Sequence, residues 1–159
     1  MTKAPAVVRD AASSDLGALL PLVRSFYALF GYPYSEERKG AALARLLADA
    51  ALGRVLLVES GGTAVGYAVL AWSFSLEFDG RTAFVDELFV AESARGQGLG
   101  SLVLRRAEEL CRDAGANALH LETEEENEGA DRLYARLGFR SYGRRLRTLL
   151  LAPIPGPKP

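Results

Sequence analysis

The sequence predicts an α/β fold in which a mixed central β-sheet of about six to seven strands is flanked by about four helices. The chain has 159 residues, 49% of them hydrophobic, which is enough for one sizeable core and too few for two ordinary domains. In the first half, runs rich in valine, leucine and aromatic residues are separated by short glycine turns, as in antiparallel hairpins. In the second half, segments with helical spacing of apolar residues alternate with strand-like segments, which is typical of parallel crossovers.

Two helices are predicted before the main sheet. A short strand at 7–8 comes first, and a helix then begins at Ser13 or Ser14 and runs to Phe30. A glycine directly after this helix and a proline soon after it provide the stop signals. A second helix is predicted over 35–50, where the first residue is a serine that can accept a backbone hydrogen bond.

The middle of the chain predicts an antiparallel meander of three strands. Strands over 54–60 and 63–77 are separated by the glycine pair 61–62, which is a strong hairpin signal. The Asp-Gly pair 79–80 marks a second turn before a strand over 81–91.

The last third of the chain predicts a helix over 98–114, a strand over 118–124, a helix over 127–137 and a strand over 140–151. Strands joined through helices run parallel, so this part makes the sheet mixed. The final strand offers an edge through which two copies can pair or swap, as in a homodimer.

Composition and charge exclude several classes of protein. Residues 1–152 are expected to form one domain, with the proline-rich residues 153–159 as a flexible tail. The 19 basic and 20 acidic side chains give a net charge of -1, so no overall field favours nucleic acid or an anionic membrane. No uncharged apolar run approaches the roughly 20 residues that cross a bilayer. The single cysteine, Cys111, excludes an internal disulfide and fits a reducing compartment, so we expect a cytoplasmic protein.

The most informative stretch is the glycine-rich turn RGQGLG at 95–100, which follows an apolar strand and opens a helix. Glycines let the backbone approach a ligand closely, and the free N–H groups of a helix start bind phosphate. A phosphate-binding P-loop would need Lys-Ser or Lys-Thr after the turn, and none follows. A dinucleotide-binding turn would need a third glycine where Ser101 stands, and the preceding antiparallel meander does not suit that fold. An ordinary glycine turn before a helix is the remaining alternative.

Two motifs together resemble the GNAT superfamily of acetyl-CoA-dependent N-acetyltransferases. Arg95, Gly98 and Gly100 meet the pattern R-x-x-G-x-G of that family's pyrophosphate loop. The stretch NEGADRLYARLGF at 127–139 is similar to the second family signature, N-x-x-A-x-x-L-Y-x-x-L-G-F. The resemblance covers roughly 54–151, and it implies a GNAT-like fold for the α/β domain.

The resemblance implies acetyl-CoA as cosubstrate and requires no metal. Backbone groups of 88–90 would pair with the pantetheine arm, and the glycine turn would hold the pyrophosphate. Asn127 would hydrogen-bond the pantetheine region, and Tyr134 would lie near the thioester sulfur. The coenzyme-binding residues expected on this basis are Leu88, Phe89, Val90, Arg95, Gly96, Gln97, Gly98, Leu99, Gly100, Ser101, Asn127 and Tyr134.

Acyl transfer to an amine needs a proton donor for the leaving thiolate. Tyr134 is the best candidate for this general acid, because a phenol with a pKa near about 10 stays protonated at neutral pH. Its apolar neighbours at helical spacing also allow a packing role.

The general base is expected among three carboxylates. Asp86 and Glu87, in VDELFV, resemble the acidic pair of polyamine-acetylating members, and Glu122 resembles a glutamate of members that acetylate protein N-termini. Because side chains alternate across a strand, Asp86 and Glu87 are not expected both to face the substrate. As candidates for the general base, Glu87 and Glu122 are therefore ranked equal, and Asp86 is ranked just below them.

The acceptor side is expected to be acidic and aromatic. The five glutamates within 122–128 would attract a cationic amine, although glutamates at a helix start are also favoured by the helix dipole. Tyr32 and Tyr34 are candidates to line the acceptor site.

Together these observations predict an N-acetyltransferase that moves an acetyl group from acetyl-CoA to a primary amine by direct attack in a ternary complex. The expected acceptor is a small cationic amine, with no nucleic acid or membrane as partner. Acetylation of a protein N-terminus or lysine is one alternative. A catalytically silent acyl-CoA-binding regulatory module is an alternative from another class.

Overall fold

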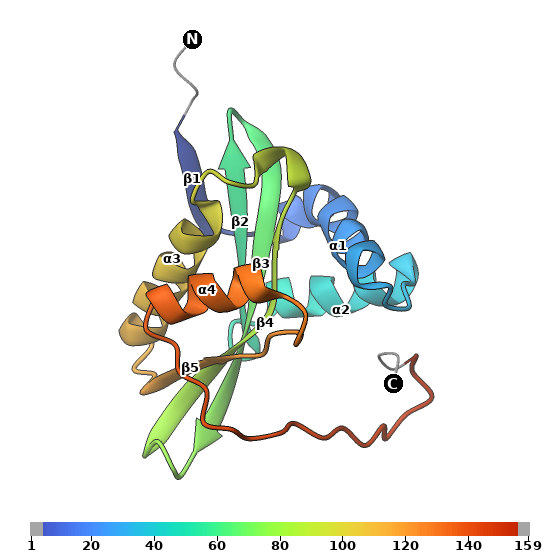
Figure 1. Ribbon diagram of the computed structural model, residues 1–159. Helices are drawn as coiled ribbons and strands as arrows, with labels where there is room; N and C mark the ends of the chain where they lie inside the picture. The colour runs from blue at the N-terminus through green and yellow to red at the C-terminus, as the bar shows by residue number, and fades with distance from the viewer. Residues whose placement is uncertain (1–4, 156–159) are drawn as a thin grey trace.

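A single twisted sheet of five strands organises the computed structural model, which describes residues 5–155 (Figure 1). The strand order is β1-β2-β3-β4-β5, in which the first four strands are antiparallel and β5 runs parallel to β4. The mixed sheet is therefore confirmed, whereas the expected six to seven strands are too many for the described residues. The strands are β1 Ala6–Asp10, β2 Gly53–Ser60, β3 Thr63–Ser75, β4 Gly80–Val90 and β5 Ala118–Leu121.

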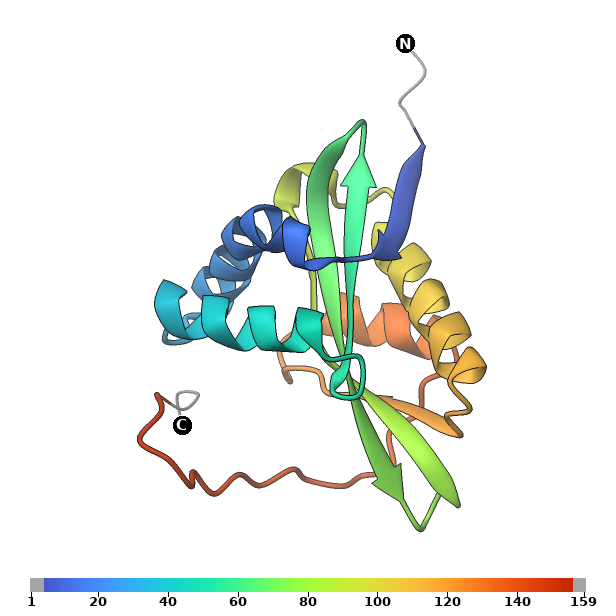
Figure 2. The same ribbon diagram turned by 180° about the vertical axis from the view of Figure 1, so that it is seen from behind.

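Two helices cover each face of the sheet, as the opposite views in Figures 1 and 2 show. On one face, α1 and α2 enclose a core that includes the fully buried Leu19 and Tyr67. On the other face, α3 and α4 pack over a second core, which includes the fully buried Leu56 and Val103. The helices are α1 Leu16–Phe30, α2 Glu36–Ala48, α3 Leu99–Asp113 and α4 Glu128–Arg136.

Local signals in the sequence place most of these boundaries. Gly31 adopts a left-handed conformation, with φ of 65°, directly after α1. The side chain of Ser35 accepts a hydrogen bond from the backbone N–H of Arg38 at 3.3 Å and so caps α2. The glycine pair 61–62, with φ of 60° and 77°, forms the turn between β2 and β3. The predicted helices and the β2–β4 meander are confirmed to within a few residues.

Strand β4 contains a β-bulge in the middle of its pairing with β3. Val69 of β3 lies opposite Glu87, but the next residue, Leu70, lies opposite Val85. Asp86 is therefore an extra residue with no direct partner on β3. A bulge of this kind bends the strand and increases its twist.

The bulge changes which face each side chain of β4 takes. Val85 before it and Leu88 after it pack on the same core, although they are three residues apart. Phe89 belongs to the core under α1 and α2, and Glu87 contacts that side as well. Asp86 and Glu87 therefore both turn toward α1 and α2. The strict alternation expected from the sequence fails here because two residues take the place of one.

The predicted strand over 140–151 is wrong for the described chain, because this stretch is extended, exposed and unpaired. Strand β5 also ends at Leu121 rather than residue 124, since the chain turns and the N–H of Asn127 donates to the carbonyl of Glu124. A strand needs a partner edge as well as suitable residues. The predicted tail begins with 153–155, which have no helix or strand, and residues 156–159 lie outside the described part.

Within residues 5–155, no helix combines the length and the apolar character needed to cross a membrane.

Candidate active site

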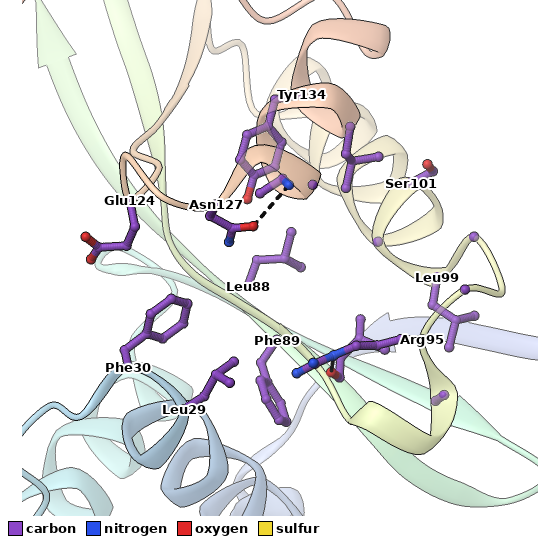
Figure 3. A pocket seen from close by; sticks show the side chains of 18 of the residues that line it. Leu29, Phe30, Leu88, Phe89, Arg95, Leu99, Ser101, Glu124, Asn127 and Tyr134 are labelled. Atoms are coloured by element: carbon purple, nitrogen blue, oxygen red, sulfur yellow. Dashed lines mark hydrogen bonds between the residues drawn. The ribbon is translucent and has the colours of Figure 1, made fainter.

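Strands β4 and β5 separate part of the way along the sheet, and a cleft lies where they part. Their pairing is confined to Thr82–Val85 of β4 and Ala118–Leu121 of β5. Beyond this point, residues 86–90 of β4 have no strand on that side among residues 5–155. The cleft has a volume of about 1160 Å³ and is bordered by β4, α1, α3 and α4 (Figure 3). It exposes a backbone edge to which an extended ligand can hydrogen-bond.

The glycine turn and the start of α3 form one end of this cleft. Gly96 and Gly98 have φ of 72° and 75°, a conformation that side chains other than glycine rarely adopt. The first N–H groups of the helix, on Leu99, Gly100 and Ser101, have no acceptor one turn earlier. These residues line the cleft, so the positive end of the α3 dipole faces it. This end is suited to an anion such as a phosphate.

Arg95 adds a positive side chain beside the turn. Its Nε donates to the carbonyl of Val90 at 2.9 Å, and its guanidinium lies 5.9 Å from the centre of the Phe89 ring. These contacts hold the exposed arginine at the cleft wall, as Figure 3 shows. Of the residues predicted to bind the coenzyme, only Gln97 does not line the cleft.

Helix α4 provides the opposite wall. Asn127 caps it, because its side-chain oxygen accepts from the N–H of Ala130 at 3.2 Å. Figure 3 shows Asn127 and Tyr134 on one side of the cleft and Leu29 and Phe30 of α1 on the other. Burial raises the pKa of Tyr134, and the nearby charge of Asp131 adds to this effect. The phenol therefore keeps its proton at neutral pH.

Glu87, which precedes the cleft residue Leu88 in the chain, is fixed by two tyrosines. The hydroxyl of Tyr27 donates to its Oε1 at 2.7 Å, and the hydroxyl of the fully buried Tyr67 donates to its Oε2 at 2.7 Å. Burial raises the pKa of Glu87, while the two hydrogen bonds lower it in part. The carboxylate is thus held in one orientation in half-buried surroundings.

The other two predicted bases, Asp86 and Glu122, lie in the same region, since Asp86 influences both Glu87 and Glu122. Partial shielding from water raises the pKa of Asp86, and the positive charge of Lys39 of α2 opposes this shift. The pKa of Glu122 is raised first by partial burial and then by the negative charges of Asp86 and Glu124. The three predicted bases therefore form one acidic region, although none of them lines the large cleft itself.

A hydrogen bond joins the two loops at the mouth of the cleft. Tyr32, after α1, donates from its hydroxyl to Glu124, after β5, and both residues line the cleft. Burial and this contact raise the pKa of Tyr32 to about 12. Tyr34 does not line the cleft, and its buried hydroxyl has no hydrogen-bond partner among the described residues. The structure therefore places Tyr32, but not Tyr34, at the predicted wall.

Sequence reasoning missed the two tyrosines that hold Glu87. Tyr27 lies 60 residues from Glu87 in the chain, and Tyr67 lies 20 residues away in a strand core. Neither belongs to a local motif, so no signal in the sequence indicates the contacts. The aromatic run at 26–34 is the only feature that points toward Tyr27.

Comparisons with known proteins identify the family of this chain. The model of the Acetyltransferase (GNAT) family matches residues 19–139. The uncharacterized N-acetyltransferase YhfO of Bacillus subtilis is 29% identical over 133 residues, covering 83% of this chain and 88% of that protein. The thialysine N-epsilon-acetyltransferase of Bos taurus is 28% identical over 144 residues, covering 83% and 82%.

A solved structure is also similar along nearly the whole chain. The integron cassette protein HFX_CASS3, from the mobile metagenome of Cole Harbour Salt Marsh, has a TM-score of 0.84 and 37% sequence identity. The match covers 93% of this chain and 92% of that one. With the family model spanning most of the chain, the protein belongs to the GNAT family of acetyltransferases and is an acyltransferase.

Proposed function

We propose that this enzyme transfers an acetyl group from acetyl-CoA to the primary amine of a small cationic acceptor, by direct attack in a ternary complex. The observation that carries the proposal is the cleft at the parting of β4 and β5. It joins an anion-binding helix start, a free strand edge and the phenol of Tyr134 beside an acidic region. This combination suits a long phosphorylated thioester at one side and a positively charged amine at the other.

The residues present fit acetyl-CoA. The N–H groups at the start of α3, with Arg95, would hold the pyrophosphate. The free edge of 88–90 would pair with the amides of the pantetheine arm as an added strand does. Asn127 already uses its side-chain oxygen to cap α4, so its amide N–H₂ group is the part left for the ligand.

Acetyl-CoA supplies an activated acyl group. The neutral amine nitrogen attacks the thioester carbonyl carbon and forms the C–N bond. The C–S bond then breaks, which leaves an amide and the CoA thiolate. Tyr134 gives its proton to the departing thiolate. A carboxylate takes the proton that the amine loses, and we assign this role to Glu87, because its fixed position and raised pKa suit a base. Asp86 and Glu122 contribute negative potential that attracts the acceptor.

The acidic region favours a small cationic acceptor. Asp86, Glu87, Glu122 and Glu124 lie on the acceptor side, and of these Glu124 reaches the cleft mouth. The bovine relative is named for acetylating the ε-amine of thialysine, which is a compact amine. Both observations support a small molecule over a protein chain as acceptor.

The test is release of the CoA thiol from acetyl-CoA by the purified protein with a panel of amines. The panel contains thialysine, lysine, polyamines, aminoglycosides and peptides with free N-termini, and acetyl-CoA alone gives the background. We expect release above background with a small cationic amine. Release with peptides only would refute the proposed acceptor class, and acetyl-CoA binding by calorimetry without release for any amine would support the silent module instead.

A further inference from the structure

Lys39 is a cation that faces the acidic region from α2. It lies one helical turn before Leu43, whose side chain is buried in the core under α1 and α2, so both residues belong to the helix face that turns toward the sheet. Figures 1 and 2 show α2 beside α1 on this face of the sheet. Lys39 is half-buried there, and no step of the acyl transfer described so far uses it.

The ammonium of Lys39 sits on the ring of Tyr27. Its Nζ lies 4.3 Å from the ring centre, which is within the range of a cation–π contact. Within residues 5–155, no ion pair or hydrogen bond joins this ammonium to a carboxylate, so the ring is the contact that places it. The hydroxyl of the same ring donates to Oε1 of Glu87 at 2.7 Å. One tyrosine therefore connects the cation of α2 to the carboxylate of β4.

The other groups of this region are acidic or neutral. The titratable groups around Glu87 come from five parts of the fold: Tyr27 of α1, Lys39 of α2, Tyr67 of β3, Asp86 of β4 and Glu122 after β5. Burial raises the pKa of both Asp86 and Glu87, and the positive charge of Lys39 lowers it in part. Among the groups that shift these two carboxyls, Lys39 is the one with a positive charge.

We propose that Lys39 is a positioning residue for the acyl transfer: its ammonium fixes the ring of Tyr27 against Glu87 and supplies the counter-charge of the acidic region until a cationic acceptor enters. The inference rests on the proposed function, in which Glu87 is the base. A cation beside Glu87 favours its ionised form, so the carboxylate is ready to take a proton from the amine. The same cation repels a positively charged acceptor and favours the neutral amine that attacks. Lys39 therefore weakens acceptor binding and supports turnover.

The first test is a pair of variants at this position. Lys39→Met keeps an unbranched stem and removes the charge, whereas Lys39→Arg keeps the charge and can stack on the same ring. With the acceptor found in the amine panel, Lys39→Met should lower the KM for that acceptor about threefold at about pH 8. It should also move the acidic limb of kcat/KM upward in pH, because a base with a higher pKa is protonated at higher pH. Lys39→Arg should restore both values.

Arg38→Met is the matched control, because it removes the same charge from the neighbouring position of α2, where the side chain is exposed. It should leave the acceptor KM and the acidic limb in place. Values for Lys39→Met equal to those of the wild type would overturn the role of Lys39. The same conclusion would follow if Arg38→Met gave an equal change, or if Lys39→Arg behaved like Lys39→Met.

A titration without substrate separates this inference from the proposed function. The carboxyl carbon of Glu87, identified in NMR spectra by its loss in Glu87→Gln, is titrated in the wild type and in Lys39→Met. Its pKa should be higher in Lys39→Met. An unchanged pKa would overturn the inference even in an active enzyme. A raised pKa without thiol release for any amine would support the counter-charge and refute the proposed function alone.

Discussion

The two sides of the cleft are built in different ways. On the proposed coenzyme side, the glycine turn and the start of α3, which follow each other in the chain, line the cleft with Arg95, Gly96 and residues 98–101. On the proposed acceptor side, the contacts at and beside the cleft join residues far apart in the chain, such as Tyr32 with Glu124 across 92 residues and Tyr27 with Glu87 across 60. Local backbone geometry therefore forms one side, and the assembled fold forms the other. The coenzyme side should be sensitive to backbone changes, and the acceptor side to individual side chains.

The largest effect on activity is expected from Tyr134→Phe, because Tyr134 is placed between the proposed coenzyme and acceptor sides. Without the phenolic proton the thiolate leaves unprotonated, so kcat should fall about 100-fold while the KM for acetyl-CoA changes little. Steady-state kinetics with the acceptor found in the panel measures both. Turnover equal to that of the wild type would remove Tyr134 from the mechanism and leave it a packing residue.

The coenzyme side is tested by Gly98→Ala, with Gly62→Ala as its matched control. Both glycines have nearly the same positive φ, 75° and 77°, and a Cβ at either meets no atom within 4 Å. Each substitution should cost about 1 kcal/mol of stability, since the backbone strain is the same. Only Gly98→Ala should raise the KM for acetyl-CoA, by roughly 10-fold, because only that turn faces the cleft. Equal KM values for the two variants would contradict the assignment of the anion site.

A smaller effect is expected from Glu124→Gln at the mouth of the acceptor side. The change removes one negative charge near the cleft, so the KM for a cationic acceptor should rise about threefold while that for acetyl-CoA stays the same. The increase should shrink at high salt, because exposed charges are screened. Glu108→Gln, on the outer surface of α3 and paired with Arg112, is the control with the same charge change.

The finest test is the pH dependence of Tyr27→Phe. The hydrogen bond from Tyr27 lowers the pKa of Glu87, so its loss should raise that pKa further. A base with a higher pKa becomes protonated at higher pH, so the acidic limb of kcat/KM should move upward in pH. Tyr34→Phe removes a hydroxyl that has no partner among the described residues and should leave the limb in place. A limb unmoved by Tyr27→Phe would argue for Glu122 or Asp86 as the base.

Much of the fold could be predicted because its boundaries depend on local chemistry. The glycine after α1, the serine before α2 and the glycine pair between β2 and β3 each act through a backbone need within a few residues. The stretch 140–151 failed because a strand depends on a partner edge, which the composition of the segment does not reveal. Its leucines are exposed, and no strand pairs with the segment within residues 5–155.

The site shows the same division. The glycine turn and Asn127 could be predicted as candidates, and they line the cleft, because each belongs to a contiguous motif at a helix start. That Asp86 and Glu87 turn to the same side could not be predicted, because a bulge arises from the register between two strands. Tyr67 was missed for a similar reason, since a tyrosine in an apolar strand gives no sign of the carboxylate it meets across the sheet.

The bulge in β4 has a further consequence. If Asp86 were absent, every other side chain of the strand would keep its present face, because the remaining residues would then alternate regularly from Val85 through Glu87 to Leu88. Asp86 is thus a surplus residue that packing does not need. It places a second carboxylate beside the first and adds the bend that helps β4 diverge from β5. A single inserted amino acid in an otherwise regular strand therefore bends the strand next to the cleft and adds one carboxylate to the acidic region beside it.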